Sequence, residues 1–168
     1  REGLQTRMLE RKGYRVIPVD IDRRFPEARI VDLNGPLPFE DETFDLIYCS
    51  EVIEHLEEPS FTVHEFFRVL KATGMIIVTT PNSHCLIFRI LEILGFPPSA
   101  IQKKDHLQFF HVKDMVSLFS TSAEIFGFFP VMLRFRLDRW VSFLSPGFII
   151  RVRKEGSMFS SSKSGMPA

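Results

Sequence analysis

The stretch FDLIYCSEVIEHLEEPSFTVHEFFRVLKATGMIIVTTPN, residues 44–82, decides the fold class. Residues 44–50 form an apolar run preceded by turn residues, which is typical of a buried strand. From Val63 onward, apolar side chains recur at i+3, i+4 and i+7, so we predict a helix that ends at Gly74. Residues 75–80 form a second apolar run, which stops at Pro81. A strand, a crossover helix and a second strand in this order pair in parallel, so the stretch predicts an α/β sheet.

Further elements are predicted on both sides of this stretch. Upstream, we expect a helix from Leu4 to Gly13, then strands at residues 14–21 and 28–33 joined by a link too short for a crossover helix. Downstream, helical spacing predicts helices at residues 86–94 and 112–119, and alternation predicts strands at residues 131–137 and 148–152. We expect this last pair to be antiparallel, near one edge of the sheet. The predicted fold is a Rossmann-like, mostly parallel sheet with helices on both faces and a C-terminal antiparallel strand pair.

Length and composition fit one globular domain. The chain has 168 residues, of which 45% are hydrophobic and 25% charged, and we place the domain at residues 1–155 and a disordered tail at residues 156–168. Because the first residue is Arg1 rather than Met, we expect the domain to be incomplete at its N-terminus. No stretch is apolar enough to predict a membrane span. Two cysteines are too few for a disulfide scaffold, which favours a reducing, cytoplasmic setting.

The charge balance limits the partners. Lys plus Arg and Asp plus Glu both number 21, which argues against a chain that coats nucleic acid or membrane by bulk charge, so any such contact is expected to be local. The two halves differ, however. Residues 1–84 contain 10 basic and 15 acidic residues, and residues 85–168 contain 11 and 6. An acidic first half suits a cationic ligand, although solvated surface charge explains most such splits.

Polar residues at the carboxyl ends of the predicted strands are the first candidates for a site, because ligands bind there in open α/β sheets. Asp20, Asp32, Ser50 and Glu51 occupy such positions. A carboxylate after the second strand of such a sheet accepts two hydrogen bonds from a ribose diol, which makes Asp20 a candidate for this role. On spacing alone, an ordinary loop aspartate explains Asp20 equally well.

Five separate motifs in one order carry a resemblance to a known family. They are LPF at residues 37–39, FDLI at 44–47, EVIEHL at 51–56, RVLK at 68–71 and TPN at 80–82. Over residues 3–154 the chain resembles the class I S-adenosylmethionine-dependent methyltransferases, in their small-molecule and ubiquinone-type branch. The resemblance implies S-adenosylmethionine as cofactor and a first strand that is missing upstream of Arg1.

The same resemblance assigns roles to individual residues. It implies that Gly3 belongs to the end of the family's glycine-rich loop and that Asp20 holds the ribose hydroxyls. It further implies that Asp32 and Leu33 flank the adenine. Ser50 and Glu51 would line the methionine end of the cofactor.

A Glu/His cluster follows the strand at residues 44–50. Glu51, Glu54 and His55 lie within one helical turn or tight loop, and two interpretations remain open. One is a solvated acidic loop in which His55 caps or packs. The other is a Mg²⁺ or Mn²⁺ site, and a resemblance to metal-dependent O-methyltransferases implies His106 as its further ligand. Without a metal, His55 or His106 would be the catalytic general base.

The predicted function is methyl transfer from S-adenosylmethionine to a hydroxyl of a small-molecule or cell-envelope metabolite. One alternative is a non-catalytic, truncated cofactor-binding remnant. Another is an RNA ribose 2′-O-methyltransferase. The direct support for an RNA partner is a set of arginines in the C-terminal third: Arg134, Arg136, Arg139, Arg151 and Arg153. Because edge-strand arginines usually serve solubility, we do not expect nucleic acid to be the partner, and the sequence does not predict an oligomeric state.

Overall fold

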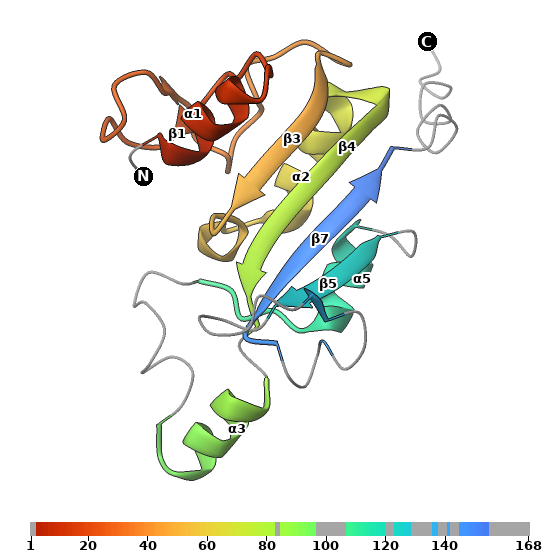
Figure 1. Cartoon of the computed structure of the whole chain (residues 1–168). Coiled ribbons are helices and arrows are strands. Elements are labelled where there is room, and N and C mark those ends of the chain that lie inside the picture. The colour runs from red at the N-terminus through yellow and green to blue at the C-terminus, as the bar shows by residue number, and fades with distance from the viewer. Residues whose placement is uncertain are drawn as a thin grey trace, which may run out of the picture.

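The computed structural model describes residues 3–82, 85–96, 107–119, 123–128, 136–137, 141 and 145–154. A five-stranded sheet has the order β3-β4-β7-β5-β6, and a separate two-stranded sheet pairs β1 with β2 (Figure 1). The strands of the larger sheet are β3 (Phe44–Ser50), β4 (Leu70–Pro81), β5 (Glu124–Phe128), β6 (Arg136–Leu137) and β7 (Gly147–Arg153). The predicted mixed α/β architecture is confirmed.

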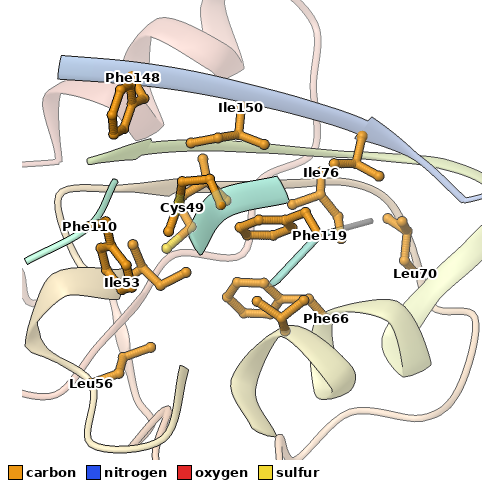
Figure 2. Close-up of a cluster of buried hydrophobic side chains, with 14 of the residues drawn as sticks. Cys49, Ile53, Leu56, Phe66, Leu70, Ile76, Phe110, Phe119, Phe148 and Ile150 are labelled. Carbon is orange, nitrogen blue, oxygen red and sulfur yellow. The ribbon is translucent and has the colours of Figure 1, made fainter. Parts of the chain in front are cut away.

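The centre of the fold is the predicted strand–helix–strand unit. β3 pairs in parallel with β4, and helix α2 (Pro59–Val69) connects them. Alternate β4 side chains, such as Ile76 and Val78, are buried on the face that α2 covers together with helix α5 (Val112–Phe119). Figure 2 shows Phe66 of α2 and Phe119 of α5 meeting below the strands. This continuous apolar layer fixes the sheet and therefore its carboxyl ends.

The predicted end of the α2 helix is wrong. The helix ends at Val69 and β4 starts at Leu70, so Gly74 lies inside the strand. Gly74 is buried there, and a Cβ at this position would lie 2.6 Å from Leu70 Cγ, so the strand has no room for a side chain. The helical apolar spacing extends to Leu70, which is why the sequence alone suggests a longer helix.

One arginine of α2 holds the turn between the two sheets. The Arg68 guanidinium donates to both carboxylate oxygens of Glu65, at 2.8 and 2.7 Å, and to the carbonyl oxygens of Leu37 and Phe39. It also donates to Asp41 at 2.8 Å. The Arg68 hydrogen bonds hold the pKa of Glu65 below its usual value. The turn that leads into β3 is thus attached to α2 through charge-assisted bonds.

The C-terminal strands are paired differently from the prediction. β7 is antiparallel, but its neighbours are β4 and β5, so it is an interior strand and not one of an edge pair with the preceding predicted strand. Of that predicted strand, the structure describes only β6, which pairs with β5. β5 itself was not predicted, because Glu124 and Gly127 interrupt its apolar pattern. The described residues of helix α3 (Leu86–Ile93) agree with the prediction.

The first two predicted strands form the smaller sheet. β1 (Val19–Asp20) and β2 (Arg29–Ile30) are parallel and much shorter than predicted. Within the described residues, β3 pairs with β4 on one edge and with no strand on the other, and Figure 1 places β1 and helix α1 (Leu4–Arg11) on that side. The predicted tail, residues 156–168, lies outside the described residues.

Candidate functional site

Hydroxyl and carboxylate groups from two parallel strands meet at the carboxyl end of the larger sheet. Ser50 Oγ lies 2.8 Å from Thr79 Oγ1, which donates to Glu51 Oε1 at 3.2 Å. Glu51 has a φ of 54°, a left-handed conformation that is costly for a residue with a Cβ. The Glu51 amide donates to the Thr79 carbonyl at 2.9 Å, and the chain turns away from the sheet there. The Glu51 side chain is exposed at the strand end, as a ligand-binding group requires.

Glu54 is the buried member of the acidic cluster. Its side chain is 1% exposed, and Oε2 accepts a hydrogen bond from Thr80 Oγ1 at 3.1 Å. Oε1 has no hydrogen-bond partner in the described part of the chain. Burial raises the pKa of Glu54, and the nearby charge of Glu51 raises it further. The main-chain carbonyl of Glu54 accepts the amides of Leu107 and Gln108, both at 2.9 Å, so this residue also anchors the chain before α5.

The Glu54→Gln variant tests this burial. A carboxyl whose folded pKa is raised destabilises the fold once it ionises, so wild-type stability should fall as pH rises above the unfolded value of 4.5. Glutamine stays neutral and should remove that loss. We expect the urea-unfolding free energy of the variant, relative to wild type, to increase from pH 4 to pH 7. A difference that stays constant over this range would contradict the assignment.

Hydrogen bonds join the end of the smaller sheet to the segment after β3. Asn34 Oδ1 accepts the amide of Glu57 at 2.9 Å, and the Leu33 carbonyl accepts Thr62 Oγ1 at 2.8 Å. Asp32 Oδ1 in turn accepts the Asn34 amide at 2.9 Å. The residues after β2 therefore lie beside the acidic segment after β3, although the strands belong to different sheets. Asn34 was not singled out from the sequence, since nothing in a turn asparagine reveals a partner 23 residues away.

Asp20 ends β1, next to these residues in the smaller sheet. It lies opposite Ile30 in the register, and its carbonyl accepts the amide of Val31 at 2.9 Å. Asp20 Oδ1 accepts the Asp22 amide at 3.2 Å, which orients the carboxylate. A carboxylate offers about four acceptor positions, so Asp20 retains capacity for hydroxyl donors. Pairing of β1 with β2 places Asp20 and the residues before Asp32 at the same end of the small sheet.

Gly3 precedes α1 and adopts the positive φ that glycine favours. Its φ is 67°, and a Cβ there would lie 2.3 Å from the ring of Phe25. Phe25 belongs to the short link between β1 and β2 and is buried. The link thus packs on the start of α1 without needing a crossover helix. Gly3 is a position that tolerates no side chain, as expected for the end of a glycine-rich loop.

The predicted metal site is not supported in the part of the chain that the structure describes. There, no group of three or more histidine, cysteine, aspartate or glutamate side chains is placed to hold a metal ion. Glu51 and Glu54 instead bond to Thr79 and Thr80, and the Glu54 carboxylate is enclosed. His55 is half-buried in a short 3₁₀ helix (Ile53–His55), whereas His106 lies outside the described residues. The two threonines were missed as partners because apolar strands commonly contain them.

The arginines that support an RNA partner are only partly described. Arg151 forms an ion pair with Glu124, and its guanidinium carbon lies 5.4 Å from the ring centroid of Phe126. Arg153 is exposed, and Arg134 and Arg139 lie outside the described residues. The pairing of Arg151 reduces the positive charge on this side of the sheet. It therefore weakens the case for RNA.

The fold is shared with solved methyltransferases. A structure described as a SAM-dependent methyltransferase from Archaeoglobus fulgidus aligns with a TM-score of 0.67 and 16% identity, covering 90% of this chain and 81% of that one. One from Methanosarcina mazei aligns with a TM-score of 0.60 and 17% identity, covering 89% and 86%. At such identities the likeness establishes the fold alone. The chain therefore has the fold of these solved SAM-dependent methyltransferases.

Sequence comparison points to the same family. Residues 1–78 match the family described as a methyltransferase domain. A probable S-adenosylmethionine-dependent methyltransferase of Mycobacterium tuberculosis is 32% identical over 90 residues, and an uncharacterised protein of Methanocaldococcus jannaschii is 43% identical over 82. These matches cover 48% and 45% of this chain but only 33% and 36% of the relatives. The resemblance predicted from the sequence motifs is confirmed, over a segment about a third as long as the curated relatives.

Proposed function

We propose that the chain binds S-adenosylmethionine and serves methyl transfer to a hydroxyl oxygen of a small-molecule or cell-envelope metabolite. The observation that carries the proposal is the junction of the two sheets, where Asn34 bonds to Glu57. This junction brings the carboxylates that follow β2 and β3 to one end of the fold. When bound, the cofactor supplies an activated methyl group on a cationic sulfur, and an acidic surrounding favours such a cation.

The residues fit the proposed cofactor by chemistry and by position. Asp20 has a carboxylate oriented by its own turn and free acceptor capacity for a ribose diol. Asp32 and Leu33 would lie against the adenine. Ser50 and Glu51 would line the methionine end, where the Thr79 hydroxyl holds both side chains in place. Gly3, before α1, would stand at the end of the glycine-rich loop that the family likeness implies.

The main contribution of this chain to methyl transfer would be to position the acceptor oxygen. An acceptor oxygen must be held in line with the bond to be broken, and orientation supplies much of the rate. A general base must also take the hydroxyl proton, and His55, in the segment after β3, is our candidate because an imidazole nitrogen can accept a proton. His106 remains the second candidate. Within this chain, we place the proposed methyltransferase domain at residues 1–155.

Calorimetry with S-adenosylhomocysteine tests the cofactor part of the proposal. We expect saturable binding of one ligand per chain, and adenosine alone should bind more weakly because it lacks the homocysteine end. If the folded chain, verified by circular dichroism, bound neither compound, the cofactor proposal would be wrong for this chain.

The acceptor is tested separately with two matched probes. The methyl donor is S-adenosylmethionine with a radiolabelled methyl group. We expect the label to appear on 4-octylphenol and not on 4-octylaniline, two compounds that differ only in carrying a hydroxyl or an amino group. Labelling of the amine alone would overturn the choice of oxygen while leaving the cofactor proposal intact.

A further inference from the structure

A threonine at the carboxyl end of β4 connects two of the candidate cofactor-binding residues. Thr79 lies opposite Ser50 in the register of the parallel strands β3 and β4, which run side by side in Figure 1. The hydroxyl oxygens of Thr79 and Ser50 are 2.8 Å apart, and Thr79 Oγ1 donates to Glu51 Oε1 at 3.2 Å. Thr79 is half-buried, whereas its neighbours Val78 and Thr80 are buried. Because strand side chains alternate, Thr79 lies on the face of β4 opposite the core that α2 and α5 cover.

The supply of hydroxyl hydrogens fixes the direction of these two hydrogen bonds. A threonine hydroxyl carries one hydrogen, and a carboxylate only accepts hydrogen bonds. Since the Thr79 hydrogen is donated to Glu51, the bond between Ser50 and Thr79 uses the hydrogen of Ser50. Hydrogen bonds therefore run from Ser50 to Thr79 and from Thr79 to Glu51, and we call these three residues the hydroxyl relay. With its hydrogen used in this way, the Ser50 oxygen offers a ligand only lone pairs, as the Glu51 carboxylate does.

Thr79 holds Glu51 by its main chain as well as by its side chain. The Thr79 carbonyl accepts the Glu51 amide at 2.9 Å, at the point where Glu51 adopts its left-handed φ of 54°. The Glu51 side chain is exposed, so the bond from the Thr79 hydroxyl is what orients its carboxylate. Successive hydrogen bonds also polarise one another, which strengthens the acceptor at Ser50. The hydroxyl relay thus prepares two acceptor groups before a ligand arrives, which lowers the ordering cost of binding.

Two acceptors, one of them negatively charged, suit a cationic donor and disfavour an anion. The methionine end of S-adenosylmethionine carries both kinds of group, an ammonium and a carboxylate. An ammonium has three hydrogens to donate and no lone pair, so it complements Ser50 and Glu51, whereas a carboxylate has no hydrogen to donate and would be repelled by Glu51. Of the two groups at that end of the cofactor, the ammonium is therefore the one that the hydroxyl relay can bind.

We propose that Thr79 is a positioning residue, which orients Ser50 and Glu51 as paired acceptors for the ammonium group of the methionine end. Thr79 acts through these two side chains and needs no contact of its own with the ligand. The inference rests on the proposed binding of S-adenosylmethionine and adds a specificity to it. The site would recognise the amino group of the ligand, and the Thr79 hydroxyl would be required for that recognition.

Calorimetry with two matched ligands tests the inference on the full 168-residue chain. The ligands are S-adenosylhomocysteine and its deamino analogue, in which hydrogen replaces the amino group. Wild type should bind S-adenosylhomocysteine at least about tenfold more tightly, since the analogue lacks the charged donor. The Thr79→Val variant, which removes the hydroxyl and keeps the side-chain shape, should lose most of this preference. Its affinity for S-adenosylhomocysteine should fall by about tenfold while its affinity for the analogue stays unchanged. Thr79→Ser should restore the preference because it keeps the hydroxyl.

Thr43→Val is the matched control, because it makes the same substitution just before the start of β3. There the Thr43 hydroxyl donates to the Glu40 carbonyl at 2.7 Å, and the variant should keep both affinities. Circular dichroism verifies the folding of each protein, and Thr79→Ala replaces Thr79→Val if that variant fails to fold.

The possible failures of the inference and of the cofactor proposal are distinguishable. Wild type that binds both ligands equally would show that the amino group is not recognised. A Thr79→Val variant that keeps the wild-type preference, or that loses affinity for both ligands alike, would show that Thr79 has no role or only a structural one. Each of these results would overturn the inference and leave the binding of S-adenosylmethionine intact. Wild type that binds neither ligand would overturn both.

Discussion

Replacing Asp20 with alanine should weaken the binding of S-adenosylhomocysteine by about tenfold to a hundredfold, because each hydrogen bond to a charged group contributes about 1.5–3 kcal/mol. Asp20 ends β1, and the Asp22 amide already holds one of its carboxylate oxygens in place. The group is therefore oriented before a ligand arrives, which lowers the ordering cost of binding. Calorimetry on both proteins measures the difference. Asp20→Asn should give an intermediate loss, since the amide keeps one acceptor oxygen.

Asp22→Ala is the matched control for this change. Asp22 is also a turn aspartate, but its carboxylate bonds to the amide of Arg24 and pairs with the Arg24 guanidinium at 2.7 Å. The Asp22→Ala variant should therefore bind S-adenosylhomocysteine as tightly as wild type does. If Asp20→Ala bound as tightly as wild type, the ribose assignment would be wrong even though the fold assignment would stand.

Replacing Arg68 with alanine should lower the free energy of unfolding by about 3 kcal/mol, the effect typical of breaking a largely buried ion pair. The change removes both bonds to Glu65, which is 6% exposed, and leaves that carboxylate with only the Leu37 amide at 2.8 Å. It also leaves the carbonyls of Leu37 and Phe39 without their guanidinium donor. Urea denaturation of the two proteins at neutral pH gives the difference.

The deficit of Arg68→Ala should shrink in acid. Arg68 lowers the pKa of Glu65 in the folded protein, so the stability from this pair is fully present above the unfolded value of 4.5 and is lost as pH falls through the folded pKa. Lys71→Ala is the control, because the Lys71–Asp45 pair is exposed to solvent and should contribute less to stability than the Arg68–Glu65 pair. Equal losses in both variants would show that Arg68 does not secure the turn.

Local patterns predicted the elements whose burial follows a simple period. β3 and the helices α3 and α5 agree with the spacing of their apolar residues. The start of β4 could not be predicted in this way, since Leu70 continues the helical spacing of α2. Pairing decides its state: Leu70 lies opposite Phe44, and the amides of Glu42 and Thr43 bond to the carbonyls of Arg68 and Val69. Contacts between residues far apart in sequence therefore override the local pattern.

The sequence predicted the strand-end residues of the candidate site, but it did not predict the contacts between them, which also join residues far apart in sequence. The rule that ligands bind at the carboxyl ends of strands selected Asp20, Asp32 and Glu51 correctly as strand-end residues, and their roles stay predictions. The bond from Asn34 to Glu57 and the enclosure of Glu54 depend on how the two sheets meet, which no spacing contains. The metal interpretation stays a prediction, since His106 lies outside the described residues and no group of three or more possible ligand side chains is found within them.

The anchor at Glu54 is made by its main chain. Its carbonyl, and not its carboxylate, holds the amides of Leu107 and Gln108. Because the Glu54 side chain is fully buried, a residue of similar size, such as glutamine, would leave that attachment in place. The side chain there can therefore be exchanged to retune acidity near the strand ends, while the path of the chain into α5 stays as it is. At this position, the acidity of the side chain can be changed independently of the main-chain hydrogen bonds that hold the segment before α5.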